Sequence, residues 1–489
     1  MDDQQTWRRR AVLRRTGAGA LALATLGATT GTGTAATGRQ QGTVSATSWP
    51  QFQADAVNGG YTETTGPSEG SVAWQFDTGE PGQPTVTPAE GETPSDQLPD
   101  DASDNVVSSP AVVDGTAYVG SNAGTLYAFD TVSGETEWTY ETVEREEVMS
   151  SPAVVDGTVY VGSHDERLHA VDADTGEREW AFEADGKIFA SPKYHDGTLY
   201  VGSQNGTMYA VDTAGEAVWQ QSVADRVDSS AAVVDDTLYV GLWNDDHTGS
   251  VVALDTATGE QVQSYPARGE IACSPTVSDD VLYFGDYARV FYAVDVGTAE
   301  LEWGREFDAP ILASPVVADG TVYVGGFDSV LLAMNVENGD VEWRFVADGQ
   351  FFSSPAVTRD ALYIGNGDSH LYAIDRATGE ELFSVETGEA ILSSPAVTAG
   401  AVFFGSSDSR FYAVGEPTGG ESVSATPPGS TDAPSSEAPS GGTDGTTSDD
   451  GPGFGVLGAL GGLGLGAWHR YRAGGDGSAA DAGDDATGE

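Results

Sequence analysis

One stretch of the sequence groups several side chains that could bind a ligand. Trp243 is followed directly by Asn244, Asp245, Asp246 and His247. Amide and carboxylate oxygens are ligands that Ca²⁺ prefers, and an indole offers a flat surface to a sugar or an apolar group. Asp and Asn are also the residues that tight turns favour, and acidic residues occur throughout this chain. The run is therefore a candidate ligand site, and its competing interpretation is a solvated turn.

Other residue types associated with catalysis form no motif. His164, His169, His195 and His370 have no spacing that forces a zinc site, so we expect polar surface or strand-edge positions for them. The sequence has neither a glycine-rich phosphate loop nor a nucleophile elbow. The single cysteine, Cys273, cannot form an intramolecular disulfide and is expected to be a small buried thiol. Nothing in the sequence demands catalysis.

The composition is strongly acidic. The 489 residues carry a formal net charge of −55, from 76 Asp and Glu against 21 Lys and Arg. Such a surface repels nucleic acid and anionic lipid headgroups, so we expect no nucleic-acid partner. At 1 M salt the Debye length falls to roughly 3 Å, which screens the self-repulsion. Apolar residues make up 39% of the chain and recur periodically, which argues against a disordered acidic chain. We interpret the composition as an adaptation to high salt.

The elements that must position these side chains come from a repeat. A Ser-Pro-Ala element recurs at intervals of about 40 residues, a period that is typical of propellers and solenoids. Its proline, or the residue that replaces it, is Pro110, Pro152, Pro192, Ala231, Pro275, Pro315, Pro355 or Pro395.

Each repeat divides into four short runs. In the second repeat they cover 151–155, 158–162, 168–172 and 178–182, separated by turns such as Asp156-Gly157. Alternation of polar and apolar residues, β-branched and aromatic enrichment, and Asp-Gly punctuation predict four antiparallel strands. The sequence therefore predicts an all-β fold, an eight-bladed β-propeller of four-stranded antiparallel blades that covers residues 72–414.

The two ends of the repeat region predict how the ring closes. The last repeat stops after 411–414 and lacks its fourth strand, whereas 72–79 resembles a fourth strand that precedes the first repeat. Because an open array would expose two sheet edges, we expect the N-terminal strand to complete the last blade.

The turns between second and third strands and the connections between blades should share one face near the channel mouth. We expect a protein partner or a small ligand to bind on this face, at Trp243–His247 or beside the acidic loop inserted at 80–105. Its other polar candidates are Asn122, His164, Asp165, Glu166, Asn205, Asp286, Asp328, Asn366, Asp368 and Asp408.

The flanking segments indicate export. Arg9 and Arg10 precede a short Ala/Leu/Gly segment, so residues 1–36 are predicted to be a twin-arginine signal peptide. A lead-in at 37–71 precedes the propeller. Residues 415–450 read as a disordered stalk rich in Ser, Thr, Pro, Gly and Asp, and 473–489 as an acidic tail. The apolar stretch within 451–472 is short for a bilayer span and is interpreted as a sorting signal or short membrane segment.

Two sets of motifs resemble known families. Ala170, Asp172, Gly176 and Trp180 are spaced as in the tryptophan-docking motif of pyrroloquinoline-quinone (PQQ)-like repeats, and residues 49–60 resemble the lead-in of secreted PQQ-like propellers of halophilic archaea. The resemblance implies that indoles wedge between neighbouring blades. These indoles belong to Trp74, Trp138, Trp180, Trp219, Trp303 and Trp343, with Gln263 and Phe383 at the two remaining positions.

The C-terminal motif Pro452-Gly453-Phe454 resembles the tripartite tail that archaeosortases process. This resemblance implies a protein that passes the export and sorting machinery and reaches the cell surface. Its only contact with the membrane would then be its C-terminal anchor.

The PQQ-like resemblance allows two classes of function. Quinoprotein dehydrogenases of this fold hold PQQ over the channel with Ca²⁺ and commonly use a vicinal disulfide, which a single cysteine excludes. Non-enzymatic relatives include an assembly scaffold of bacterial outer membranes. We expect a non-catalytic cell-surface binding or scaffold propeller with no required cofactor. The alternatives are a PQQ-dependent dehydrogenase or related redox enzyme, which would need PQQ and Ca²⁺, and a surface polysaccharide-binding module that uses Trp243.

Overall fold

The computed structural model of the protein describes residues 6–8, 48–79 and 104–417. The predicted twin-arginine pair Arg9-Arg10, most of the inserted loop, the stalk and the C-terminal motif Pro452-Gly453-Phe454 lie outside these residues and stay predictions.

The described residues form eight antiparallel sheets, numbered here as blades 1 to 8. Blades 1 and 2 contain β3 (Ala111–Val113), β4 (Thr116–Gly120), β5 (Thr125–Asp130), β6 (Thr136–Glu141), β7 (Ala153–Val155), β8 (Thr158–Gly162), β9 (Arg167–Asp172) and β10 (Arg178–Glu183). Blades 3 and 4 contain β11 (Lys193–His195), β12 (Thr198–Gly202), β13 (Thr207–Asp212), β14 (Ala217–Ser222), β15 (Ala232–Val234), β16 (Thr237–Trp243), β17 (Gly249–Asp255) and β18 (Gln261–Pro266). Blades 5 and 6 contain β19 (Thr276–Ser278), β20 (Val281–Gly285), β21 (Val290–Asp295), β22 (Leu301–Glu306), β23 (Val316–Ala318), β24 (Thr321–Gly325), β25 (Val330–Asn335) and β26 (Val341–Val346). Blades 7 and 8 contain β27 (Ala356–Val357), β28 (Ala361–Gly365), β29 (His370–Asp375), β30 (Glu381–Glu386), β31 (Ala396–Thr398), β32 (Ala401–Ser406), β33 (Arg410–Gly415) and β2 (Val72–Asp77).

Two short elements lie outside this pattern. The strand β1 (Thr6–Arg8) pairs with the outer edge of β22, and the 3₁₀ turn η3 (Val143–Arg145) connects blades 1 and 2. Within the part of the chain that the structure describes, no helix has the length and apolar character to cross a membrane.

The strands follow from the local sequence. In blade 2, β7 and β8 are joined by Asp156 and Gly157, whose φ angles are 49° and 81°. Positive φ at both central residues is the two-residue hairpin turn that Asp-Gly favours, since its twist matches that of the flanking strands. The strand β8 is buried along its whole length, because neighbouring blades cover both of its faces.

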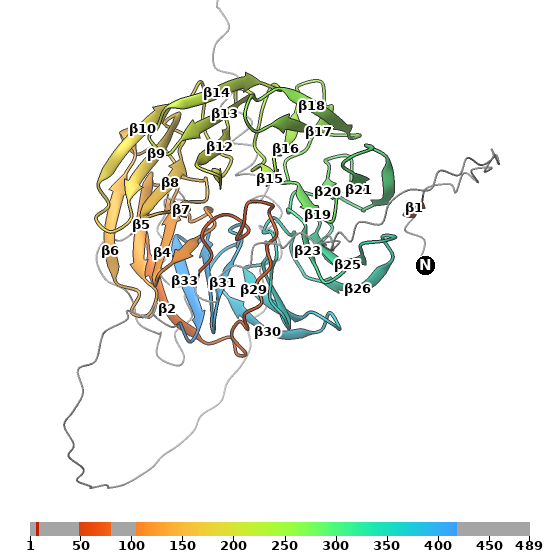
Figure 1. Ribbon diagram of the computed structural model, residues 1–489. Coiled ribbons are helices and arrows are strands. Elements are labelled where there is room, and N and C mark those ends of the chain that lie inside the picture. The colour runs from red at the N-terminus through yellow and green to blue at the C-terminus, as the bar shows by residue number, and fades with distance from the viewer. Residues whose placement is uncertain (1–5, 9–47, 80–103, 418–489) are drawn as a thin grey trace, which may run out of the picture. The chain divides into compact units, whose positions relative to one another are not determined.

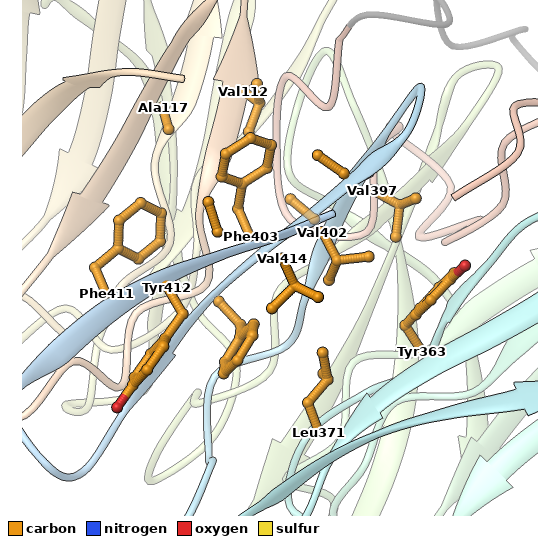
Figure 2. Close-up of a cluster of buried hydrophobic side chains, with 14 of the residues drawn as sticks. Val112, Ala117, Tyr363, Leu371, Val397, Val402, Phe403, Phe411, Tyr412 and Val414 are labelled. Carbon is orange, nitrogen blue, oxygen red and sulfur yellow. The ribbon is translucent and has the colours of Figure 1, made fainter. Parts of the chain in front are cut away.

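The last blade is composite, as the sequence predicts. The strand β2 pairs antiparallel with β33, with Trp74 opposite Ala413 and Phe76 opposite Phe411. Figure 2 shows how the buried side chains of β32 and β33, such as Phe403 and Phe411, lie among residues of blades 1 and 7. The prediction of an eight-bladed ring closed by an N-terminal strand is confirmed.

A closed circle of hydrogen bonds joins the inner ends of the blades. In each blade one serine precedes the inner strand, its backbone N–H donates to the hydroxyl of the equivalent serine in the next blade, and the distances are 2.9 to 3.1 Å. Ser394 of blade 8 donates to Ser109 of blade 1 and completes the circle. The serine ring consists of Ser109, Ser151, Ser191, Ser230, Ser274, Ser314, Ser354 and Ser394. The repeated Ser-Pro element is therefore a structural joint between blades.

Tryptophans join the blades at the outer rim. The indole N–H of Trp138 donates to the carbonyl of Ala173 in blade 2 over 2.8 Å. Its ring packs on Gly176, where an added Cβ would lie 2.7 Å from a ring atom, so only glycine fits. Equivalent bonds run from Trp74, Trp180, Trp219, Trp303 and Trp343 to the carbonyls of Thr131, Thr213, Thr256, Val336 and Arg376.

The lead-in fills the centre of the ring. Trp49 exchanges two backbone hydrogen bonds with Val112 of blade 1, and Thr65 accepts one from Gly400 of blade 8. Between these ends the lead-in bonds to each of blades 2 to 7, through backbone groups or side chains. In Figure 1 this red to brown segment crosses the middle of the circle of inner strands. Each free inner edge therefore finds hydrogen-bond partners in the chain itself.

A buried lysine fixes the lead-in to blade 3. Lys193 is fully buried, and its Nζ donates to the carbonyls of Phe52 and Asp55. Burial lowers the pKa of Lys193, and the Asp55 carboxylate opposes this shift by attraction. The Asp55 carboxylate accepts the Gly59 N–H at 2.6 Å, which holds the lead-in in a tight bend.

Candidate functional site

One face of the ring is built from the turns that follow the second strands. In every blade, one residue of this region donates its backbone N–H to a carbonyl in the connection that enters the blade. The donors are Asn122, His164, Gln204, Trp243, Tyr287, Phe327, Gly367 and Ser407, and the acceptors belong to Asn105, Glu147, Lys187, Arg226, Glu270, Pro310, Gln350 and Ala390. These turns and connections therefore lie on one face, called the connection face below.

Three neighbouring blades carry aromatic residues at this position. Trp243, Tyr287 and Phe327, called the aromatic arc below, belong to blades 4, 5 and 6, and all three side chains are half-buried. Trp243 and Tyr287 meet edge to face with ring centroids 5.0 Å apart. Phe327 packs against Phe352 of blade 7 at 4.4 Å. The other five blades have Asn, His, Gln, Gly or Ser at this position, so the connection face has an aromatic side and a polar side.

Charged residues hold Trp243 in place. The guanidinium of Arg226 lies over the indole, 5.5 Å from the ring centroid. Arg226 also pairs with Asp228, with 2.6 Å between Nε and Oδ2, and Asp228 accepts a hydrogen bond from Gln204 at 3.1 Å. A cation over one face and Tyr287 at the edge leave the indole little rotational freedom.

The polar run beside Trp243 is a turn. The strands β16 and β17 extend to Trp243 and Gly249, which pair with each other, so only residues 244–248 form the turn. The Asp246 carboxylate accepts hydrogen bonds from the side chain and backbone of Thr248, which lower its pKa. Asn244 is half-buried and Asp245 is exposed. Exposed His247 contacts Glu270, with 2.5 Å between Nδ1 and Oε1.

No cation site is assembled on this turn. Among the described residues, no three His, Cys, Asp or Glu side chains come together as metal ligands would. The oxygens of the run serve the turn itself, which favours the solvated-turn interpretation.

Apolar side chains precede the serines of the ring in the sequence of each blade but one. Two residues before each ring serine, the repeat places a side chain that is half-buried in seven blades. These residues, called the apolar collar, are Val107, Met149, Phe189, Ala272, Leu312, Phe352 and Leu392. Blade 4 has Asp228 instead, 5% exposed and bonded to Arg226. The collar adjoins the aromatic arc through the contact between Phe327 and Phe352.

Several acidic candidates are buried supports of the connection face. Asp286 is fully buried and accepts hydrogen bonds from the Val290 N–H at 2.7 Å and the Tyr292 hydroxyl at 2.8 Å. Burial raises the pKa of Asp286, and it does the same for Asp328 and Asp408. Asp408 accepts the Tyr412 hydroxyl in the same way as Asp286 accepts that of Tyr292. These carboxylates organise turns.

The expectation of polar surface or strand-edge positions for His164 and His169 is wrong. His169 is fully buried and bridges the Asp165 carboxylate, at 3.0 Å, and the Tyr140 hydroxyl, at 2.9 Å. His164 is also buried, and its Nδ1 lies 2.5 Å from the Glu147 carboxylate. His169 occupies the place of Tyr292 and Tyr412 in their blades, so its contact with Asp165 repeats a structural bond of the fold.

The remaining candidates keep to their turns. Glu166 adopts a positive φ of 65°, which suits the turn before β9. The Nδ2 of Asn205 donates to the Asp185 carbonyl. Asn366 is buried and donates to the Gly349 carbonyl at 2.9 Å, and the Asp368 carboxylate accepts the Tyr372 hydroxyl at 2.8 Å. His195 and His370 are half-buried.

The centre of the ring does not fit PQQ. This cofactor is a tricarboxylate, so it needs cationic partners and, in quinoproteins, a calcium site. In the described part of the chain, the lysine at the centre, Lys193, is bonded to lead-in carbonyls. Arg226, beside the collar, is paired with Asp228. The collar itself is apolar, so these residues offer no cradle for the cofactor.

Two grooves lie elsewhere, between neighbouring blades. One, of about 430 Å³, is lined by polar residues of blades 2 and 3 that include Asp185, Thr207 and Tyr209. The other, of about 310 Å³, lies between blades 4 and 5 and is lined by residues that include Arg268, Tyr292 and Gly304. Neither is lined by a residue of the aromatic arc or the apolar collar.

The chain is similar to a known family over most of its length. A family model described as outer membrane protein assembly factor BamB matches residues 59–230, 204–306, 247–354 and 348–441. No curated protein is detectably similar to the chain. The solved BamB of Moraxella catarrhalis is 20% identical, with a TM-score of 0.54 over 64% of this chain and 96% of that one.

Two redox enzymes share the fold. A europium-containing methanol dehydrogenase is 14% identical, with a TM-score of 0.61 over 76% of this chain and 98% of that one. The quinohemoprotein alcohol dehydrogenase of Comamonas testosteroni is 16% identical, with a TM-score of 0.58 over 76% of this chain and 81% of that one. At these identities, the similarity to the solved structures shows the fold alone. The family model covers most of the chain, and this protein therefore belongs to the family of PQQ-like repeat propellers described as outer membrane protein assembly factor BamB.

Proposed function

We propose that this protein is a non-catalytic binding or scaffold propeller that holds a protein partner at the surface of a cell living in high salt. The observation that carries the proposal is the lead-in, which bonds in every blade to the inner strand or to a residue just before or after it. The chain itself occupies the centre of the ring, and the residues there give PQQ no cationic cradle. A family described as an assembly factor supports a partner that is a protein.

Sequence features support the proposed location at the cell surface. Arg9 and Arg10 suit twin-arginine export, Pro452-Gly453-Phe454 suits processing and anchoring at the C-terminus, and the net charge of −55 suits high salt. Intact mass of protein recovered from membranes tests this part. We expect residues 1–36 and the segment after the C-terminal motif to be missing and a lipid-sized mass to be added. An intact C-terminus would refute the processed anchor.

The function is tested by titrating the full chain with PQQ and Ca²⁺ in molar KCl. We expect no saturable heat of binding and no dye-linked alcohol dehydrogenase activity above that of buffer. Saturable binding together with turnover would overturn the scaffold proposal in favour of a quinoprotein.

A further inference from the structure

The aromatic arc is a local departure from the repeat. The fold requires only a backbone N–H at this turn position, because Gly367 and Ser407 make the same bond in blades 7 and 8. Three consecutive blades nevertheless carry large aromatic side chains there, and each remains partly exposed. Neighbouring, partly exposed aromatic residues without a role in the fold are typical of a recognition surface.

The arc is rigid before any partner arrives. Arg226 covers one face of Trp243, Tyr287 meets its edge, and Phe327 is packed on Phe352. Because these side chains are already ordered, binding costs little rotamer entropy, and rigid aromatic anchors serve as hot spots for this reason.

The collar limits the chemistry of the occupant. Val107, Met149, Leu312 and Leu392 carry no hydrogen-bonding side-chain groups and are half-buried. Sugar hydroxyls need hydrogen-bond partners, so an aliphatic collar suits an apolar side chain of a polypeptide better than a glycan.

Charge around the aromatic arc further limits the chemistry of the occupant. Asp225, Asp245, Asp308 and Asp348 are exposed in the turns and connections of the aromatic side. Arg268 and Arg289 are exposed on the same side, but Arg268 pairs with Glu306 at 2.9 Å, and Arg289 donates to the carbonyl of Asp308. The excess of carboxylates favours a cationic partner.

We propose that the aromatic arc and the apolar collar bind a segment of a partner protein that presents an apolar side chain next to lysine or arginine. This inference rests on the scaffold function proposed above and adds the surface and the chemistry of the partner. In molar salt the charge contribution is screened, whereas apolar contacts persist, so the arc supplies the affinity and the carboxylates supply the selectivity.

The probe is a displayed library of random 12-residue peptides, selected against the folded full chain in 2 M KCl. We expect enriched peptides to combine an aromatic or large aliphatic residue with neighbouring Lys or Arg. Their dissociation constants should rise about tenfold or more on Trp243→Ala or Phe327→Ser. Asn122→Ala and Ser407→Ala, at the equivalent positions of blades 1 and 8, should leave binding unchanged. The conservative variant Trp243→Phe should retain most of it, and equal thermal midpoints verify that the variants fold.

Three outcomes would overturn the inference: no enriched peptide, enriched peptides that bind the arc variants equally well, or binding of an oligosaccharide array that Trp243→Ala abolishes. A photo-crosslinker at position 327, compared with one at position 122, tests the same surface in cells. Crosslinks to protein only from position 122, with no PQQ binding, would refute the arc and leave the scaffold function standing. PQQ turnover would refute both.

Discussion

The hydroxyl of Tyr265 donates to the carbonyl of Val296 over 2.8 Å, across the junction between blades 4 and 5. At six other junctions the carbonyl at this position accepts an indole N–H instead. Gln263 stands at the tryptophan position of blade 4, and Ala299, with φ of 55°, replaces the glycine on which the indole would pack. Tyr265, two residues further along β18, is 2% exposed and takes over the bond.

This substitution leads to a graded stability prediction. Tyr265→Phe should cost about 1 kcal/mol, the value of one buried hydrogen bond, and Tyr265→Ala about 3–5 kcal/mol because it also leaves a cavity. Trp303→Ala at the next junction should match the larger value, since Trp303 is fully buried. Denaturant unfolding measures all three. Gln263→Trp alone should not rescue Tyr265→Ala, because the Cβ of Ala299 stands in the way; rescue would contradict this account.

Replacing a serine of the ring should destabilise the protein more than replacing the residue just before it. Ser314→Ala removes the acceptor of the Ser274 N–H and leaves it buried, which costs about 1–3 kcal/mol. Ser353, whose hydroxyl accepts the Gly365 N–H at 3.1 Å, is the matched control, since blades 3 and 6 have Ala190 and Ala313 at this position. Ser353→Ala should therefore cost less in the same unfolding experiment. Equal losses would mean that the ring bonds contribute nothing special.

Lys193 should be essential for holding the lead-in against blade 3. Lys193→Met leaves two carbonyls and the half-buried Asp55 carboxylate without their neighbouring cation, which we expect to cost about 3–5 kcal/mol. Limited proteolysis should then cut within residues 48–66 much faster than in the wild type, while the blades stay protected. Lys187→Met is the control, because Lys187 is an exposed lysine in the connection that enters the same blade. Unchanged cleavage in Lys193→Met would show that the backbone bonds alone hold the lead-in.

Cys273 should be unreactive in the folded protein. It is 1% exposed, and burial raises the pKa of its thiol to about 12. Its Sγ accepts the Gly285 N–H at 3.3 Å, as Ser229 Oγ accepts the Gly241 N–H in blade 4. Iodoacetamide at pH 8 should label it only after unfolding, as read by mass spectrometry. Cys273→Ser should change the stability by less than about 1 kcal/mol, and labelling without unfolding would contradict the burial.

Asp375, in the turn before an outer strand, should make the protein sensitive to acid. Hydrogen bonds from Thr378 lower the pKa of Asp375 below its ordinary value of 3.8. A lowered folded-state pKa means stability that is present above the unfolded-state pKa and lost as the pH falls through the folded-state value. Asp375→Asn removes this titration, so the stability gap between wild type and variant should shrink from pH 5 to pH 3. Blade 6 has Asn335 in this place. For Asn335→Asp, the urea midpoint of the variant should fall relative to that of the wild type from pH 5 to pH 3.

Local patterns carry the fold. The alternation in runs such as 158–162, the Asp156-Gly157 turn and the fourth-strand pattern around Trp74 each act within a few residues, so the eight blades and their closure could be read from the sequence. The lead-in could not, because its partners, among them Val112 and Gly400, lie far away in sequence and it repeats no pattern.

The candidate site was readable in part. Trp243 stands out in the sequence, whereas Tyr287 and Phe327 become visible only when the turns of all blades are aligned by their shared hydrogen bond. Burial of His169 could have been found by the same alignment, since tyrosine occupies its position in blades 1, 3, 5, 7 and 8.

The composite blade also has a consequence for biosynthesis. The ribosome completes β2 early, but its partner β33 emerges after every other strand, and the Thr78 hydroxyl meets the carbonyl of Ser409 across 331 residues of chain. Such a distant contact closes slowly and only once the whole ring exists. In a prematurely terminated chain β2 stays unpaired, and the last blade exposes the edge of a strand that is paired on both sides in the finished molecule. Proteases could recognise unfinished chains by these unpaired segments.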